Sequence, residues 1–517
     1  MTADESDGNV QVKFHPSSLV WIASIISWTS ILNYGIVIGY HAASIDSLKE
    51  WTQIKVDNST DNETSRVISG SIDWNESDYE SWFASIVAIG SIFGSLASGP
   101  VLAILGPKRT VTVSHIPFLI GWIMIIFGTS IPVLIIGRFL SGFSVGFCNG
   151  PVAIYTMEIS TPNIRGILGI SSSTVGDFGI LLAALLAFKL RYDHVATVSA
   201  IISILGPTIM LFMPESPVFL YSKYIRTQSQ EDWEGVRSSL SKLRKSDSNV
   251  SREIESIENT ASNRVKQKLW LSLNEVKQVK VYKPMVMALG LSFLQQCTGV
   301  NAVLFYNHYI FKESGYELPV SIVVILTGLV MTSFCFIGSL IIDRFGRKKL
   351  LLYTGIILLI SLLTLSFYFQ FKPSDDDTIH LNGIYLVNGK LYENDTLYGK
   401  DRSRSSEYGS KYGIIALLSM LTFMGVFMIA FGPVPWLMVP EMSPYFARPF
   451  ITASSVSVNR LIVFIITQYF ISLTQIIGFH GCFYLFAVNT FLSLIFIKFL
   501  LPETKGKTME ELDELFD

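Results

Sequence analysis

The stretch Q-Q-C-T-G-V-N-A-V-L-F-Y, residues 295 to 306, places three amide side chains inside an otherwise apolar segment. Gln295, Gln296 and Asn301 can each donate and accept hydrogen bonds, which is the chemistry that holds the hydroxyl groups of a polar solute. An unpaired amide is costly in hydrocarbon, so these groups must face one another, water or a ligand. We therefore expect them to line a solute path. The alternative is that they join neighbouring helices.

No arrangement of residues for covalent chemistry accompanies these amides. The sequence has no phosphate-binding glycine loop, no H-E-x-x-H motif and no nucleophile with its base. The four cysteines lie in apolar segments without C-x-x-C spacing, so we expect small core residues rather than disulfides or metal ligands. We expect no metal, no cofactor and no enzymatic activity. The cysteines are Cys148, Cys297, Cys335 and Cys482.

The composition is typical of a protein that crosses a membrane many times. Half of the 517 residues are hydrophobic, 13% are aromatic and only 15% are charged, a mixture unlike that of soluble domains. The formal net charge of −2 gives no reason to expect nucleic acid as a partner. The first residues are acidic, and the apolar run from Ser18 is one of many, so we expect a retained first helix rather than a cleaved signal.

Counting about 20 apolar residues for one crossing, the sequence predicts an all-α protein of roughly twelve spanning helices. The predicted ranges are 20–44, 82–105, 111–130, 132–156, 166–188, 195–213, 284–309, 320–342, 349–371, 412–438, 450–475 and 479–500. The polar stretch 221–283 divides them into two six-helix bundles. We expect an amino-terminal segment 1–19, a first bundle 20–213, a linker with short helices 214–283, a second bundle 284–500 and a tail 501–517.

The positive charges predict which loops face the cytoplasm. Lys108, Arg109 and the basic linker occupy connections on one side, which the positive-inside rule assigns to the cytoplasm together with both termini. The loops on the other side, 45–81 and 372–411, carry N-x-S/T sequons and are expected to be glycosylated. The sequons are at Asn58, Asn62, Asn75 and Asn394.

The two halves repeat the same pattern. Glu158 and Arg165 follow the fourth predicted helix with the same separation as Glu441 and Arg448 after the tenth. A P-E-S motif at 214 and a P-E-T motif at 502 close the two halves alike. A duplicated six-helix unit indicates a secondary transporter with its binding site between the halves.

The segment G-S-L-I-I-D-R-F-G-R-K-K at 338–349 resembles the cytoplasmic motif of major facilitator transporters, in their sugar porter branch. Flanking positive charge alone does not account for Asp343 beside Arg344 at the membrane edge. Within that branch, the runs that begin at 165 and 432 look most like insect facilitated trehalose and glucose carriers. Further matching motifs are G-R-F at 137, Glu158 with Arg165-Gly166, P-E-S-P at 214, Q-Q-x-x-G-x-N at 295, G-P-V-P-W at 432 and P-E-T-K-G at 502.

The resemblance implies the major facilitator fold, with a hexose or a disaccharide bound between the bundles. Gln295, Gln296 and Asn301 would hydrogen-bond its hydroxyls, and Trp436 would stack on its C–H face. The prolines beside Trp436 leave the alternative of a packing aromatic at a helix bend. For Asn459 on the eleventh helix, binding sugar and joining helices are equally expected.

Six charged residues are expected to form ion pairs between the cytoplasmic ends of the bundles. Closing that face would make the pairs and opening it would break them. One surface pair contributes only about 0 to 1 kcal/mol, but a network can bias a two-state equilibrium. For Arg165, simple headgroup charge is the alternative. The residues are Glu158, Arg165, Asp343, Arg344, Glu441 and Arg448.

Three positions depart from the resembled family. His41 stands where proton-coupled sugar porters carry Asp, so we expect facilitated diffusion, although a histidine can itself titrate near neutral pH. Met331 replaces an Asn of the family. Arg460 stands inside the eleventh helix in place of Trp, and a mid-membrane arginine faces water or a partner. We expect Asp177 to approach Arg460 across the cavity.

These observations predict a facilitative transporter (uniporter) for a hexose such as glucose, or for trehalose, in the plasma membrane. The expected partners are the sugar and the lipid bilayer, and the protein is expected to work as a monomer. The altered first-half motif, with Ala103, Ile104 and Pro107, and Arg460 favour a rival, a transporter-like receptor that binds sugar without efficient flux. A second rival is a proton-coupled symporter that uses His41 or Asp177.

Overall fold

The computed structural model describes residues 16–57, 79–244, 254, 257–258, 272–316, 318–372, 378–381, 384–387, 390–392, 395–444 and 446–505. Eleven helices in these ranges are long and apolar enough to cross a membrane. The longest, α18 (Arg448–Phe499), turns at Gly478, where φ is 70°, and therefore supplies two crossings. The predicted fold class of about twelve spanning helices is confirmed.

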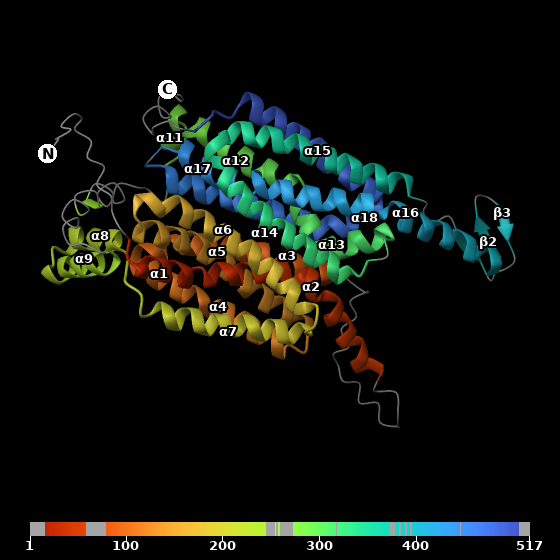
Figure 1. Ribbon diagram of the computed structural model, residues 1–517, viewed down its shortest axis with the longest axis horizontal. Helices are drawn as coiled ribbons and strands as arrows, with labels where there is room; N and C mark the ends of the chain where they lie inside the picture. Colours follow the sequence, from red (N-terminus) through yellow and green to blue (C-terminus); the bar gives the residue numbers. More distant parts are fainter. Residues whose placement is uncertain are drawn as a thin grey trace, which may run out of the picture.

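The first half of the chain forms one bundle, drawn in red to yellow in Figure 1. Glycines allow its helices to approach closely, since a Cβ at Gly94 on α3 would lie 1.9 Å from the Phe143 carbonyl oxygen on α5. The helices are α1 (Ser18–Ser27), α2 (Thr29–Asp57), α3 (Tyr79–Leu105), α4 (Pro107–Phe127), α5 (Ile131–Ile159), α6 (Pro162–Ala187) and α7 (Tyr192–Met210).

The second half forms the other bundle, drawn in green to blue beside the first (Figure 1). Two of its crossings are interrupted, one between α12 and α13 and one between α16 and α17. The helices are α12 (Val279–Cys297), α13 (Val300–Ser314), α14 (Val320–Phe345), α15 (Arg347–Phe371), α16 (Asp395–Ile429), α17 (Val434–Met442) and α18.

A small antiparallel sheet of order β1-β2-β3 lies between α15 and α16. Its strands are β1 (Thr378–Leu381), β2 (Ile384–Val387) and β3 (Lys390–Tyr392). The sequence analysis predicted only a polar loop at 372–411, so this sheet and the first turns of α16 are additions to the predicted fold. The four predicted glycosylation sites, Asn58, Asn62, Asn75 and Asn394, lie outside the described residues.

The linker between the bundles contains α8 (Pro217–Thr227), α9 (Gln230–Leu243) and α11 (Leu273–Val276). α8 and α9 bury a small cluster that includes Val218 and Leu240. Arg244, directly after α9, donates from Nη1 to the carbonyl oxygen of Ile159 at 2.9 Å, which holds the linker against the end of α5. We call this end of the bundles the linker end and the other, near β2 and β3 in Figure 1, the far end.

Glu215 and Glu503 occupy the same place in the two halves. The Glu503 carboxylate accepts hydrogen bonds from the backbone N–H groups of Arg347 (3.0 Å) and Lys348 (3.2 Å), which begin α15. Glu215 accepts one from the backbone N–H of Lys108 (3.1 Å) in the first turn of α4. A carboxylate at a helix amino terminus pairs otherwise free N–H groups and favours the helix dipole. The P-E-S and P-E-T motifs therefore have the same packing role.

Replacing Glu503 with alanine should lower the free energy of unfolding by about 1 to 2 kcal/mol. Glu215→Ala should cost less, because burial raises the pKa of the Glu215 carboxyl despite its backbone hydrogen bonds. An acid with a raised native pKa loses stability as the pH rises from its ordinary range through that pKa. Thermal unfolding in detergent measures both, with the exposed Glu234→Ala as control. A larger loss for Glu215→Ala would contradict this interpretation.

Candidate functional site

The predicted amide stretch lies at a break in a spanning helix. α12 ends at Cys297 and α13 begins at Val300, with Gly299 between them at φ 85°. A side chain at Gly299 would also collide with the Phe486 ring, 2.3 Å from the added Cβ. The range 284–309 is therefore one crossing but not one helix, because the left-handed glycine ends α12. Broken helices in membranes free backbone polar groups where a cavity is lined.

Gln295 is bound on every side by the protein. Its Nε2 donates to the carbonyl oxygens of Phe431 (2.5 Å) and Gly432 (3.2 Å), and its Oε1 accepts from Asn459 Nδ2 (2.9 Å). The Phe431 carbonyl lacks the usual donor four residues later because that residue is Pro435. Gln295 supplies the missing N–H and is only 2% exposed. In this conformation it joins α12 to the bend between α16 and α17.

Gln296 and Asn301 are differently placed. Asn301 Nδ2 donates to Gln296 Oε1 across the helix break. This leaves Gln296 Nε2 as a donor and Asn301 Oδ1 as an acceptor, each without a protein partner among the described residues. Neither of these two atoms is among the buried polar atoms that lack a partner, so both are accessible to a small molecule. A free donor beside a free acceptor matches the hydrogen-bonding needs of a sugar hydroxyl pair.

The other two predicted binding residues differ in exposure. Asn459 is fully buried, and its amide donates to Gln295, so the structure favours its helix-joining role. Trp436 lies in the first turn of α17, four residues after Gly432, and is half-buried. No ring in the described part of the chain stacks on it. Stacking of Trp436 on a ligand stays a prediction.

Asp177 and Arg460 are not joined by an ion pair in this conformation, although both are among the described residues. The Asp177 carboxylate accepts a hydrogen bond from the Cys335 thiol on α14, and Arg460 lies close enough to Cys148 on α5 for a Coulombic interaction. Their direct approach stays a prediction for another conformation.

The charged residues at the linker end pair within their own halves. Glu441 Oε1 binds Arg347 Nη2 at 3.2 Å inside the second half, and Glu158 accepts a hydrogen bond from Ser216 inside the first. Arg347 was not among the predicted gating residues. Arg347 is the first residue of α15 and directly follows Gly346, so its side chain lies at the linker end. This position in the sequence could have identified it as a partner for Glu441.

Two more of the predicted gating residues are described at the linker end. Arg448 Nη2 donates to the Ser443 carbonyl oxygen at 3.4 Å, beside its own helix, and Arg344 is exposed. The side chains of Arg165 and Asp343 lie outside the description. Ion pairs between the halves at the linker end stay a prediction.

A polar cluster that the sequence analysis did not assemble connects the halves toward the far end. Glu80 on α3 lies with its Oε1 4.0 Å from His41 Nε2 on α2 and 3.7 Å from His308 Nε2 on α13. Its Oε2 binds Lys49 Nζ at 2.5 Å. Neither ring nitrogen of His41 has a partner within hydrogen-bond distance. These residues come together only in the folded structure. No sequence pattern near any one of them predicts the cluster.

Further contacts between the halves lie in the same region. The Trp82 ring on α3 and the Phe464 ring on α18 have centroids 5.9 Å apart, and Ser85 Oγ donates to Gln468 Oε1 at 2.6 Å. All four residues lie in the part of α3 and α18 remote from the linker end. The halves are thus closed against each other toward the far end.

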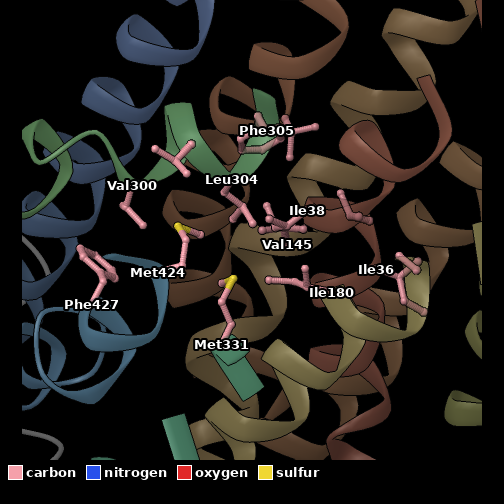
Figure 2. Packing of buried hydrophobic residues seen from close by; sticks show 14 of the residues in the cluster. Ile36, Ile38, Val145, Ile180, Val300, Leu304, Phe305, Met331, Met424 and Phe427 are labelled. Atoms are coloured by element: carbon pink, nitrogen blue, oxygen red, sulfur yellow. The ribbon is translucent and has the colours of Figure 1, made fainter. Parts of the chain in front are cut away.

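Apolar side chains complete this closure. Figure 2 shows residues of both halves in one buried cluster. Met331, at a position where the resembled family has a polar residue, is fully buried in it. Leu304 and Phe305 follow Asn301 by about one turn, so these two members of the cluster lie beyond the free amides toward the far end. Its labelled members include Ile38, Val145 and Ile180 of the first half with Leu304, Met331 and Met424 of the second.

Comparison with known proteins gives one family across the chain. The model of the family "sugar (and other) transporter" matches residues 22–516. Facilitated trehalose transporters Tret1 of Polypedilum vanderplanki and Apis mellifera ligustica are each 30% identical, over 84% and 85% of this chain and 78% and 80% of those proteins. Tret1 of Drosophila grimshawi is 29% identical over 84% of this chain, and the match spans only 42% of that relative's length.

Solved structures show the same fold. The xylose transporter XylE from E. coli in its inward open conformation has a TM-score of 0.70 at 19% identity, over 96% of this chain and 100% of that chain. A double tryptophan mutant of XylE also has a TM-score of 0.70, at 20% identity, over 97% of this chain and 100% of that chain.

Proposed function

The chain belongs to the sugar transporter family, and we propose that it carries a sugar across the plasma membrane by facilitated diffusion. Its fold is the major facilitator fold that the sequence motifs predicted. The observation that carries the proposal is the free donor of Gln296 beside the free acceptor of Asn301 at a broken helix. Glucose and trehalose are the proposed substrates, since similar proteins are named as trehalose transporters.

Transport proceeds in this proposal by alternating access between the halves. Sugar enters from the linker end, which the positive charges assign to the cytoplasm together with both termini. Its hydroxyls bind Gln296 Nε2 and Asn301 Oδ1, and its C–H face lies on Trp436. Contacts that the bound sugar gains with the first half favour closure of the linker end, and the far end then opens. No covalent step is needed, and one chain suffices.

The surroundings of Arg138 favour uniport over proton coupling. Arg138 is fully buried and donates to the carbonyl oxygens of Val37 (2.8 Å) and Phe83 (3.2 Å). The Tyr40 and Phe83 rings lie 5.7 Å and 5.0 Å from its guanidinium carbon. Carbonyl dipoles and ring faces thus stabilise this cation, and no carboxylate among the described residues forms an ion pair with it. Position 41, one turn beyond Val37, carries a histidine.

Proton coupling stays a second candidate because titratable groups meet between the halves. The Nε2 atoms of His41 and His308 both lie within 4.0 Å of the Glu80 Oε1 atom. A proton held there would break or strengthen the contact that closes the far end. Asp177 on α6, hydrogen-bonded to α14, is the other carboxylate between the halves.

The Glu80 cluster should control opening of the far end. Glu80→Gln removes the charge that attracts His308 and Lys49, so we expect the far end to open at least about fivefold more often. A cysteine introduced at Ala42, 7% exposed beside Ala184 and Val324 at the interface, reports opening through its reaction with a water-soluble maleimide. The exposed Asp46→Asn is the matched control. Equal labelling in Glu80→Gln and the parent would contradict the proposed latch.

One experiment separates the three functions. The purified chain is reconstituted into vesicles, and uptake of labelled glucose and trehalose is followed with and without a proton gradient. Equilibration that the gradient does not change is expected and supports facilitated diffusion. Gradient-driven accumulation would assign symport, and saturable binding without uptake would assign a receptor. Absence of both binding and uptake for either sugar would overturn the proposed substrates.

A further inference from the structure

Arg460 faces the space between the halves at about mid-membrane depth. It follows Arg448, the first residue of α18, by twelve positions, which corresponds to about 18 Å along the helix. Phe464 and Gln468, four and eight residues later, lie on the same helix face and contact α3 of the opposite half. Arg460 therefore points across the interface, on the linker side of these contacts.

The guanidinium group of Arg460 has no anionic partner among the described side chains. The Arg460 Nε atom is buried and has no hydrogen bond, whereas the two terminal nitrogens, Nη1 and Nη2, are accessible. Its Coulombic neighbour across the interface is the Cys148 thiol, which is a neutral group at ordinary pH. A cation at this depth is costly without a counter-charge.

The carboxylates nearest to the interface are already engaged elsewhere. Asp177 accepts its hydrogen bond from Cys335 on α14. Glu80 binds Lys49 at 2.5 Å and faces the two histidines toward the far end. Neither carboxylate forms an ion pair with Arg460 in the part of the chain that the structure describes, so in this conformation a ligand can supply the counter-charge.

We propose that Arg460 binds an anionic group on the transported sugar, so that the site accepts sugar acids. This inference rests on the proposed function and deepens it. Asn459, next in sequence, holds Gln295 at 2.9 Å, and Gln295 precedes the free amide of Gln296. In this proposal one ligand presents hydroxyl groups to Gln296 and Asn301 and a carboxylate to Arg460. A guanidinium binds a carboxylate or a phosphate through two parallel hydrogen bonds.

The test compares binding of glucose, glucuronate and glucose 6-phosphate to the purified full chain by titration calorimetry. The ratio of anionic to neutral sugar affinity is the readout. We expect the chain to prefer an anionic sugar, and Arg460→Gln to lower the ratio at least about tenfold. Arg460→Lys should retain part of it, and added salt should reduce it. Arg237→Gln, an exposed arginine on α9, should leave the ratio unchanged.

The outcomes separate this inference from the proposed function. Preference for glucuronate supports a carboxylate as the anionic group, and preference for glucose 6-phosphate supports a phosphate. Glucose binding with no anionic preference, or a ratio that Arg460→Gln does not change, would overturn the inference and leave sugar transport standing. Failure of all three sugars to bind would overturn both.

Discussion

Asn301→Ala is expected to lower the initial rate of sugar uptake at least about tenfold while the protein stays folded. The change removes the free acceptor Oδ1 and the donor that orients Gln296. A bound hydroxyl left without its partner costs about 1 to 3 kcal/mol, and tenfold corresponds to about 1.4 kcal/mol. Uptake into vesicles that contain equal amounts of reconstituted protein measures the effect.

The matched control for this variant is Asn489→Ala. Asn489 donates to the Leu294 carbonyl oxygen at 3.1 Å and contacts α12 without reaching the helix break. It should change stability rather than the apparent affinity for sugar. Uptake by Asn301→Ala at the rate of the parent would show that the sugar does not bind at the break.

Gln295→Ala is expected to lower the free energy of unfolding by about 3 kcal/mol or more. It leaves the Phe431 and Gly432 carbonyls and the Asn459 amide without their partner in a buried site. Each such buried polar group costs about 1 to 3 kcal/mol. Thermal or denaturant unfolding in detergent is the measurement.

The exposed Gln475→Ala is the control for the loss of a glutamine from a spanning helix, and it should unfold like the parent. A Gln295→Ala protein of normal stability that has lost sugar binding would reverse the assignment. Gln295 would then contact the sugar directly, as the resemblance implied.

The crossings and the amide stretch could be predicted because their signals are local. Hydropathy over about 20 residues marks a crossing, and an amide run within it needs a polar partner. The break at Gly299 was not predicted, since a glycine inside a helical pattern does not show that it is left-handed. The sheet after α15 was missed because its short strands lie in a polar stretch.

The different roles of Gln295 and Gln296 could not be predicted, because they depend on residues far away in the chain. Gln295 is held by a carbonyl that lacks its donor since residue 435 is proline. The sequence around residue 295 does not show that this carbonyl, far away in the chain, lacks a donor. The contact of Glu80 with His308 has the same origin, because it exists only when the halves are assembled.

Alternating access between the two halves is the central claim. It is tested most directly by the distance between spin labels on Arg109→Cys and Lys349→Cys, exposed positions at the linker end of each half. We expect saturating sugar to add a population with a shorter distance, while the pair Arg109→Cys and Arg237→Cys, on the first half and on the linker held against it, stays unchanged. A distance distribution that no transported sugar alters would contradict the claim.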